Sequence, residues 1–89
     1  MLIPYYSKQF EKDLKRMLSR GKSGTKIKYV IRKLINEERL ERCYGEHKLI
    51  GNYKSMHECH IEPDWLLIYK IFQDEIIFQR TGTHADLFE

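Results

Sequence analysis

The spacing of apolar residues changes along this 89-residue chain, and that change limits the folds it can adopt. Between residues 8 and 35 apolar side chains recur with the period of a helix that buries one face. From residue 53 onward they form short runs separated by turn-forming residues, which is typical of strands. A chain of this length has room for one hydrophobic core. We therefore predict a single α+β domain spanning residues 1–89.

Two helices are predicted in the first half. Ser7 is the expected N-cap of the first helix, which should end at Gly21, and Gly24 and Thr25 should open the second. Each helix carries one apolar stripe, which we expect to face the core. The stripes consist of Phe10, Leu14, Met17 and Leu18 in the first helix and Ile27, Val30, Ile31, Leu34 and Ile35 in the second.

Four strands are predicted, at residues 2–6, 53–61, 65–72 and 76–81. Pro4 favours an edge position for the first strand, because proline cannot donate to a neighbouring strand. Turns at residues 62–64 and 73–75 should connect the last three strands as a meander. The predicted order is β-α-α-β-β-β, with the two helices packed on one face of a small antiparallel sheet. The other face is then open to hold a site.

Charge is distributed unevenly around the net value of +3. Residues 1–42 carry 12 Lys and Arg against 5 Asp and Glu, whereas residues 43–89 carry 4 against 8. A basic half attracts an anionic partner such as RNA, although basic residues also simply solvate the outer faces of helices. Both interpretations stay open on charge alone.

Several features bear on where the protein works. No apolar run approaches the roughly 20 residues that cross a bilayer, and the first residues lack the pattern of a signal peptide. We therefore predict a cytoplasmic protein without a membrane partner. Cys43 and Cys59 are expected to be reduced, with a bridge between them as the alternative.

Four side chains near strand ends suggest a catalytic site. His60 and Asp64 lie at one end of the predicted hairpin, while Arg80 and His84 lie at the end of the last strand. Imidazoles transfer protons near neutral pH, and a guanidinium holds anionic oxygens. Cleavage of RNA by its own 2′-hydroxyl needs a base, an acid and a cation near the phosphate. The set fits a small ribonuclease, although each of these residues taken alone is more often an ordinary surface residue.

A metal site is not expected. His57 and Cys59 share one face of their predicted strand while His60 points to the other, and no pair of ligands has the spacing of a zinc site. No phosphate-binding glycine-rich motif is present either. We therefore predict a catalyst without cofactor or metal.

Three segments of the chain are similar to a known family. They are residues 47–54, residues 58–69 with the pattern H-x-E-P-D-W-x-x-x-Y, and residues 80–88 with R-T-G-T-H. Together they resemble the YafQ branch of the RelE/ParE toxin superfamily, and the predicted order of helices and strands matches as well. The resemblance covers nearly the whole chain.

The resemblance implies a toxin of a type II toxin–antitoxin system that cleaves mRNA in the ribosomal A site. It implies that His60 and His84 transfer protons, leaving open which is the base, and that Arg80 clamps the phosphate. His47 and Asp64 would assist catalysis or orient the substrate, and Phe88 would contact a base. Within the similar segments we also count Trp65 and Lys54 as substrate-binding candidates.

The resemblance also implies partners: the 70S ribosome with its mRNA, and an acidic cognate antitoxin of the DinJ/RelB kind. The alternative is a non-catalytic inhibitory toxin like the ParE branch, which shares the fold and acts on gyrase. A protein that only binds has no need of His60, Asp64, Arg80 and His84 together. The residues therefore favour the ribonuclease.

Overall fold

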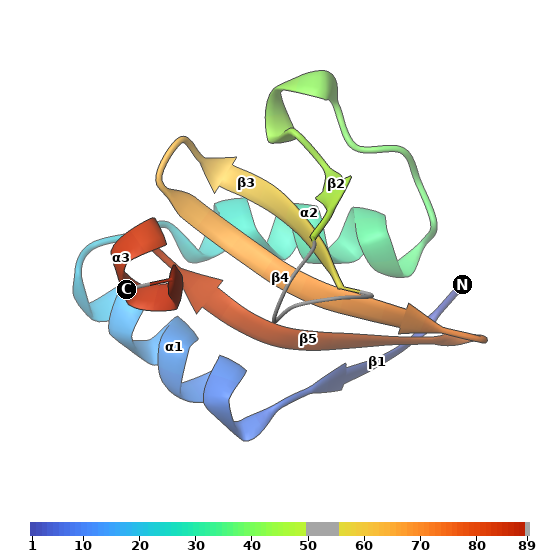
Figure 1. Ribbon diagram of the computed structural model, residues 1–89, viewed down its shortest axis with the longest axis horizontal. Coiled ribbons are helices and arrows are strands. Elements are labelled where there is room, and N and C mark those ends of the chain that lie inside the picture. The colour runs from blue at the N-terminus through green and yellow to red at the C-terminus, as the bar shows by residue number, and fades with distance from the viewer. Residues whose placement is uncertain (50–55, 89) are drawn as a thin grey trace.

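The computed structural model describes residues 1–49 and 56–88, which form a five-stranded sheet with helices on both faces (Figure 1). In chain order the elements are β1 (Ile3–Tyr6), α1 (Lys8–Ser19), α2 (Gly24–Ile35), the 3-10 helix η1 (Arg42–Tyr44), β2 (His47–Lys48), β3 (His57–Glu62), β4 (Trp65–Phe72), β5 (Glu75–Gly82) and α3 (His84–Phe88). The predicted α+β class and the order of its main elements are confirmed.

The strand order across the sheet is β1-β5-β4-β3-β2. The meander of β3, β4 and β5 is antiparallel, as predicted, whereas β1 pairs with β5 in parallel. Apolar period does not encode strand direction, and more than 60 residues separate these two strands, so no hairpin forces them to be antiparallel. The short strand β2 extends the opposite edge and was not predicted.

The first two helices begin at serine caps. Ser7 Oγ accepts a hydrogen bond from the Phe10 N–H, and Ser23 caps α2 in the same way. After α1 the chain turns at Gly21, whose φ of +91° suits a residue without a Cβ. The predicted helix positions are therefore confirmed, and the second cap is Ser23.

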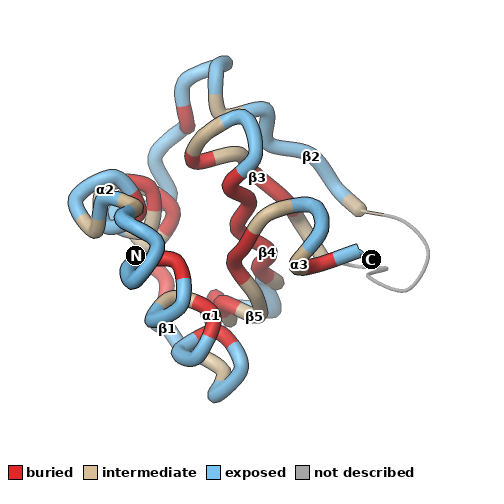
Figure 2. Tube along the Cα trace, turned by 90° about the vertical axis from the view of Figure 1, so that its left-hand side faces the viewer, coloured by how far each residue is buried: buried red, intermediate tan, exposed pale blue. Residues whose placement is uncertain are grey.

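The main core lies between the sheet and the layer of α1 and α2 (Figure 2). It includes Phe10, Met17, Ile27 and Val30 from the helices, as the two stripes predict. Leu18 is the exception, with 44% of its surface exposed. A smaller cluster lies on the other face, where α3 covers part of the sheet; it consists of Leu66, Ile68 and Leu87, with Leu49 and Met56 packed against it.

The edge of the sheet at β5 is covered in two different ways. β1 pairs with residues 75–78 only. Beyond them a register shift between Ile68 and Tyr69 leaves Gln79 as an extra residue of β5, a β-bulge after which β5 continues to pair with β4 as far as Gly82. From Gln79 onward, α1 and its N-cap bind the backbone of this edge. Ser7 Oγ donates to the Gln79 carbonyl, and Asp13 accepts the Thr81 N–H. A helix thus satisfies backbone groups that a strand would otherwise pair.

Neither Cys43 nor Cys59 is bridged; the first is exposed and the second is buried. Among residues 1–49 and 56–88, no helix has the length and apolar character needed to cross a bilayer.

Candidate active site

Four aromatic rings line up across the face of the sheet that carries α3. His47 comes from β2, His60 from β3, and His84 and Phe88 from α3. The ring centroids are 6.3 Å apart for His47 and His60, 5.9 Å for His60 and His84, and 6.3 Å for His84 and Phe88. The structure therefore brings together the three histidines and the phenylalanine that the sequence singled out.

Glu58 joins two of these histidines. Its Oε1 lies 3.3 Å from His47 Nε2 and 3.6 Å from His60 Nε2, and its side chain is only 7% exposed. The other ring nitrogen of His47, Nδ1, lies 2.9 Å from the Gly45 carbonyl oxygen and can donate to it. A carboxylate between two imidazoles can accept a hydrogen bond from a ring N–H on either side, so it orients both rings.

Glu58 was not predicted as a site residue, although the sequence carried a signal for it. Glu58 and His60 are two residues apart in a strand, so they share a face, while Cys59 and Ile61 point into the main core. An acidic residue on the same strand face as a histidine predicted to be catalytic is a candidate partner for it.

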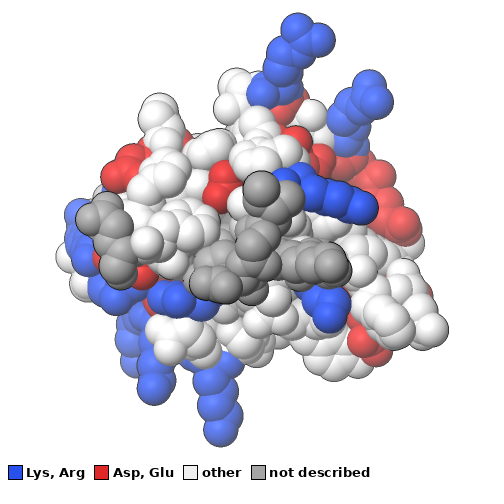
Figure 3. Space-filling view, in the orientation of Figure 1, with Lys and Arg blue, Asp and Glu red and all other residues white. Residues whose placement is uncertain are grey.

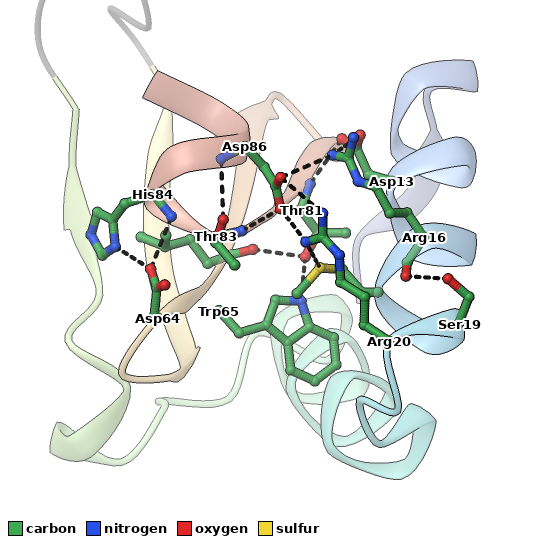
Figure 4. Close-up of polar contacts among 12 residues, drawn as sticks. Asp13, Arg16, Ser19, Arg20, Asp64, Trp65, Thr81, Thr83, His84 and Asp86 are labelled. Atoms are coloured by element: carbon green, nitrogen blue, oxygen red, sulfur yellow. Dashed lines mark hydrogen bonds and ion pairs between the residues drawn. The ribbon is translucent and has the colours of Figure 1, made fainter. Parts of the chain in front are cut away.

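His84 is fixed by Asp64 (Figure 4). Asp64 Oδ1 lies 2.6 Å from His84 Nδ1 and accepts the His84 backbone N–H at 2.9 Å. These two hydrogen bonds hold the pKa of Asp64 below its ordinary value. When Nδ1 donates to Asp64, the remaining nitrogen, Nε2, is the one that can exchange a proton with a substrate.

The start of α3 is also fixed from within. Thr83 Oγ1 accepts from the Asp86 N–H at 3.1 Å, and Asp86 Oδ2 accepts from the Thr83 N–H at 3.0 Å, which is a capping box. Arg20 of α1 binds the same carboxylate, with Nη1 at 2.7 Å, and lowers the pKa of Asp86. His84 therefore stands at a helix start that is tied to α1.

Arg80 is the predicted phosphate clamp, and the structure places its guanidinium against α1. Nε and Nη2 donate to the carboxylate of Asp13 at 2.7 and 3.3 Å. In the sheet Arg80 pairs with Ile68, and Ile68 pairs with Glu58. Arg80 therefore occupies a position of β5 that lies directly across β4 from Glu58. Its side chain is 25% exposed, whereas that of Asp13 is completely buried.

Asp13 was not predicted to matter, because both helices were interpreted as core packing. Burial acts to raise its pKa, but hydrogen bonds from Arg80, Gln9 and the Thr81 N–H outweigh burial and leave the pKa below its ordinary value. Asp13 lies between the buried Phe10 and Met17 on the inner face of α1. A charged residue within an apolar stripe was the available signal.

Trp65, which was predicted to contact substrate, lies in the core of the structure. The side chain is fully buried, and its indole Nε1 donates to Thr81 Oγ1 at 2.9 Å (Figure 4). Thr81 Oγ1 in turn donates to the Leu66 carbonyl at 2.7 Å, so the indole is part of the core. Lys54, the other substrate-binding candidate, lies outside the described residues.

Basic side chains project from the surface in two places. In Figure 3 they stand out at the lower left, over α1, and at the upper right, over the segment that carries η1 and β2. Within the described part of the chain, no three His, Cys, Asp or Glu side chains form a group able to hold a metal ion.

The chain matches a known protein family along nearly its whole length. A family model described as "Bacterial toxin of type II toxin-antitoxin system, YafQ" matches residues 3–89. The mRNA interferase toxin YafQ of Escherichia coli strain K12 is 45% identical over 84 residues, which cover 93% of this chain and 91% of that protein. The putative toxin YafQ of Haemophilus influenzae is 37% identical over 87 residues, covering 90% and 85% of the two chains.

A solved structure extends the likeness to three dimensions. A chain in the crystal structure of the E. coli DinJ–YafQ complex superposes with a TM-score of 0.93 at 42% identity, with 100% of both chains covered. The agreement therefore includes the path of the backbone through all of the elements described above.

Proposed function

This chain belongs to the YafQ family of type II toxin–antitoxin toxins, and we propose that it is an endoribonuclease that inhibits translation by cleaving mRNA in the ribosomal A site. The observation that carries the proposal is the pair of His60 and His84, whose rings are 5.9 Å apart and each lie beside a carboxylate. A ribonuclease that uses the RNA's own hydroxyl needs two such groups. A toxin that only binds its target does not.

The proposed reaction is transesterification without a metal. One imidazole of the pair takes the proton of the ribose 2′-hydroxyl, and the oxygen attacks the neighbouring phosphorus. The bond from phosphorus to the 5′-oxygen breaks, and the other imidazole gives that oxygen a proton. The products are a 2′,3′-cyclic phosphate and a 5′-hydroxyl. Each positioned acid or base typically contributes about 10²–10⁴-fold in rate.

The carboxylates and the guanidinium have supporting tasks in this proposal. Glu58 lies beside His47 and His60 and orients both rings on that side of the phosphate, and Asp64 aims Nε2 of His84 from the other side. Arg80 supplies positive charge near the phosphate, where negative charge increases in the transition state.

The proposed partners are the ribosome, its mRNA and an antitoxin encoded beside the toxin, all in the cytoplasm. The basic first half of the chain suits contacts with ribosomal RNA phosphates, and such binding should weaken steeply with salt. Its charge also suits an acidic antitoxin, and the E. coli relative was solved in complex with DinJ. Purification from a strain that expresses both neighbouring genes should give an inactive complex.

The test is primer extension on mRNA that ribosomes are translating, with purified wild-type protein and the variants His60→Ala and His84→Ala. Each variant should cleave at least about 10²-fold more slowly while keeping the wild-type melting temperature. The matched control is His57→Ala, because His57 stacks on Tyr69 with centroids 5.4 Å apart, on the opposite face of β3. That variant should retain activity.

The chemistry of the new ends tests the mechanism separately. We expect 2′,3′-cyclic phosphate or 3′-phosphate together with 5′-hydroxyl ends. Finding 5′-phosphate ends would contradict internal attack, because they require water as the nucleophile. Cleavage by both histidine variants within a few-fold of wild type would refute the catalytic assignment, and an absence of cleavage by the wild type would favour a binding toxin.

A further inference from the structure

A cleft of about 590 Å³ opens beside His60. Its walls come from α2, from η1 and from the end of β3 with the turn that follows. The lining residues are Lys26, Cys43, Tyr44, His60, Ile61, Glu62 and Pro63. The cleft is within the usual range of volumes for sites that bind small ligands.

The walls of the cleft combine flat apolar surfaces with a charged rim. Tyr44 and Pro63 provide the flat surfaces, and the Tyr44 ring is braced by the Tyr29 ring at a centroid distance of 6.2 Å. At the rim Glu62 accepts from Lys26 Nζ at 2.8 Å and from Lys22 Nζ at 2.7 Å. An aromatic face beside donors and an acceptor is the combination that holds an unpaired nucleobase.

The cleft and the ring row share His60. The segment carrying Tyr44 packs so closely on this ring that a Cβ built on Gly45 would lie 3.2 Å from His60 Nδ1. Gly45 also has a φ of +53°, a backbone conformation that other residues rarely adopt. An occupant of the cleft is therefore held directly beside a catalytic imidazole.

The order of the groups suggests a path for an RNA strand. Phe88 stands next to His84, His84 next to His60, and His60 next to the cleft. A phosphate between the two imidazoles would have one neighbouring nucleotide toward Phe88 and the other toward Tyr44. The two flanking nucleotides would then each meet an aromatic ring.

We propose that the cleft of Tyr44, Lys26 and Glu62 is a subsite for the nucleobase that adjoins the scissile phosphate on the side away from Phe88. This inference rests on the proposed ribonuclease function. It assigns to Tyr44, Lys26 and Glu62 an influence on which mRNA sequences are cut. The base stacks on Tyr44, while Lys26 and Glu62 offer a donor and an acceptor to its polar edge.

The first experiment maps cleavage sites on translated mRNA with Tyr44→Leu and Lys26→Met. Leucine preserves apolar volume next to Tyr29 but removes the aromatic face. Cleavage should slow by about tenfold or more for Tyr44→Leu, and the base preference next to the cut should change for both variants. The matched control is Lys28→Met, which removes a lysine of the same helix that does not line this cleft. Melting temperatures are measured for all variants.

The result that overturns the proposal is a folded Tyr44→Leu that cuts the same sites at the wild-type rate. If Tyr44→Leu does not fold, the Lys26→Met variant provides the test. A base preference of Lys26→Met that equals that of the wild type then rejects the subsite.

A second experiment does not depend on cleavage. Isotope-labelled wild-type protein is titrated with adenosine 3′-monophosphate and with uridine 3′-monophosphate, and amide chemical shifts are followed. We expect changes at Cys43, Tyr44 and Ile61; changes confined to residues 84–88 would reject the cleft. If the wild type binds nucleotides there but cleaves no translated mRNA, the proposed function fails while the cleft stands as a nucleotide site.

Discussion

Replacement of Asp13 by alanine should destabilise the protein far more than a typical helix substitution. The change removes a fully buried carboxylate that binds Arg80 through two hydrogen bonds and also accepts the N–H of the buried Thr81. An unsatisfied buried N–H costs about 1–3 kcal/mol. Breaking a fully buried ion pair costs about 3–5 kcal/mol, and less here because Arg80 still reaches water.

Together these contributions suggest a loss of about 3 kcal/mol in the free energy of unfolding. For a chain of this size, that corresponds to a fall in melting temperature on the order of 15 °C. Urea unfolding and thermal melting, both followed by circular dichroism, measure the two quantities. The matched control is Glu11→Gln, an exposed carboxylate of the same helix, which should change the free energy by no more than about 0.5 kcal/mol.

Asp13→Asn separates charge from shape. The amide oxygen can still accept the Thr81 N–H, but the amide no longer offers a negative charge to Arg80. We expect an intermediate loss of about 1–2 kcal/mol at neutral pH. Mapping of cleavage by the same variant then tests whether Asp13 positions Arg80, since a misplaced guanidinium lowers the rate even where the protein is folded.

The pH dependence gives a further check on the same residue. The pKa of Asp13 is lower in the folded chain than in the unfolded chain, so the unfolded state binds protons first as pH falls. The stabilisation is complete above the unfolded pKa of about 4 and is lost as pH falls through the folded pKa. The stability gap between wild type and Asp13→Asn should therefore shrink below about pH 4. A gap that is constant with pH, or a loss below about 1 kcal/mol for Asp13→Ala, would refute the role of a buried anion.

Three further predictions follow from burial and contacts in the site. Phe88→Ala should slow cleavage by an amount equivalent to about 1–3 kcal/mol while melting stays near wild type, whereas Leu87→Ala should lower the unfolding free energy by about 2–5 kcal/mol. Trp65→Phe should lower the free energy of unfolding by about 1–3 kcal/mol through the lost hydrogen bond and leave cleavage by the folded protein intact. Slow cleavage by a variant of wild-type stability would instead support a contact between Trp65 and substrate. Asp64→Asn should slow cleavage by about tenfold or more without changing the melting temperature, because it weakens the hold on His84 Nδ1; a wild-type rate would show that this contact is dispensable.

The sequence alone determined the local elements and several members of the site. The serine cap and apolar stripe of α1, the nearly unbroken apolar run of β4 and the turns of the meander follow from rules that act over a few residues. Motif positions likewise indicated His47, His60, His84 and Phe88, which the fold brings into one row.

Tertiary structure alone decided which distant groups meet. The parallel pairing of β1 with β5, the carboxylate of Asp13 under Arg80 and the position of Glu58 between two imidazoles depend on contacts across the sheet or between layers. The burial of Trp65 has the same origin, since its partner Thr81 lies on another strand. The period of apolar residues predicts which face of a strand or helix a residue occupies. Which residues lie opposite that face depends on strand order and register, and these are set by packing between distant segments.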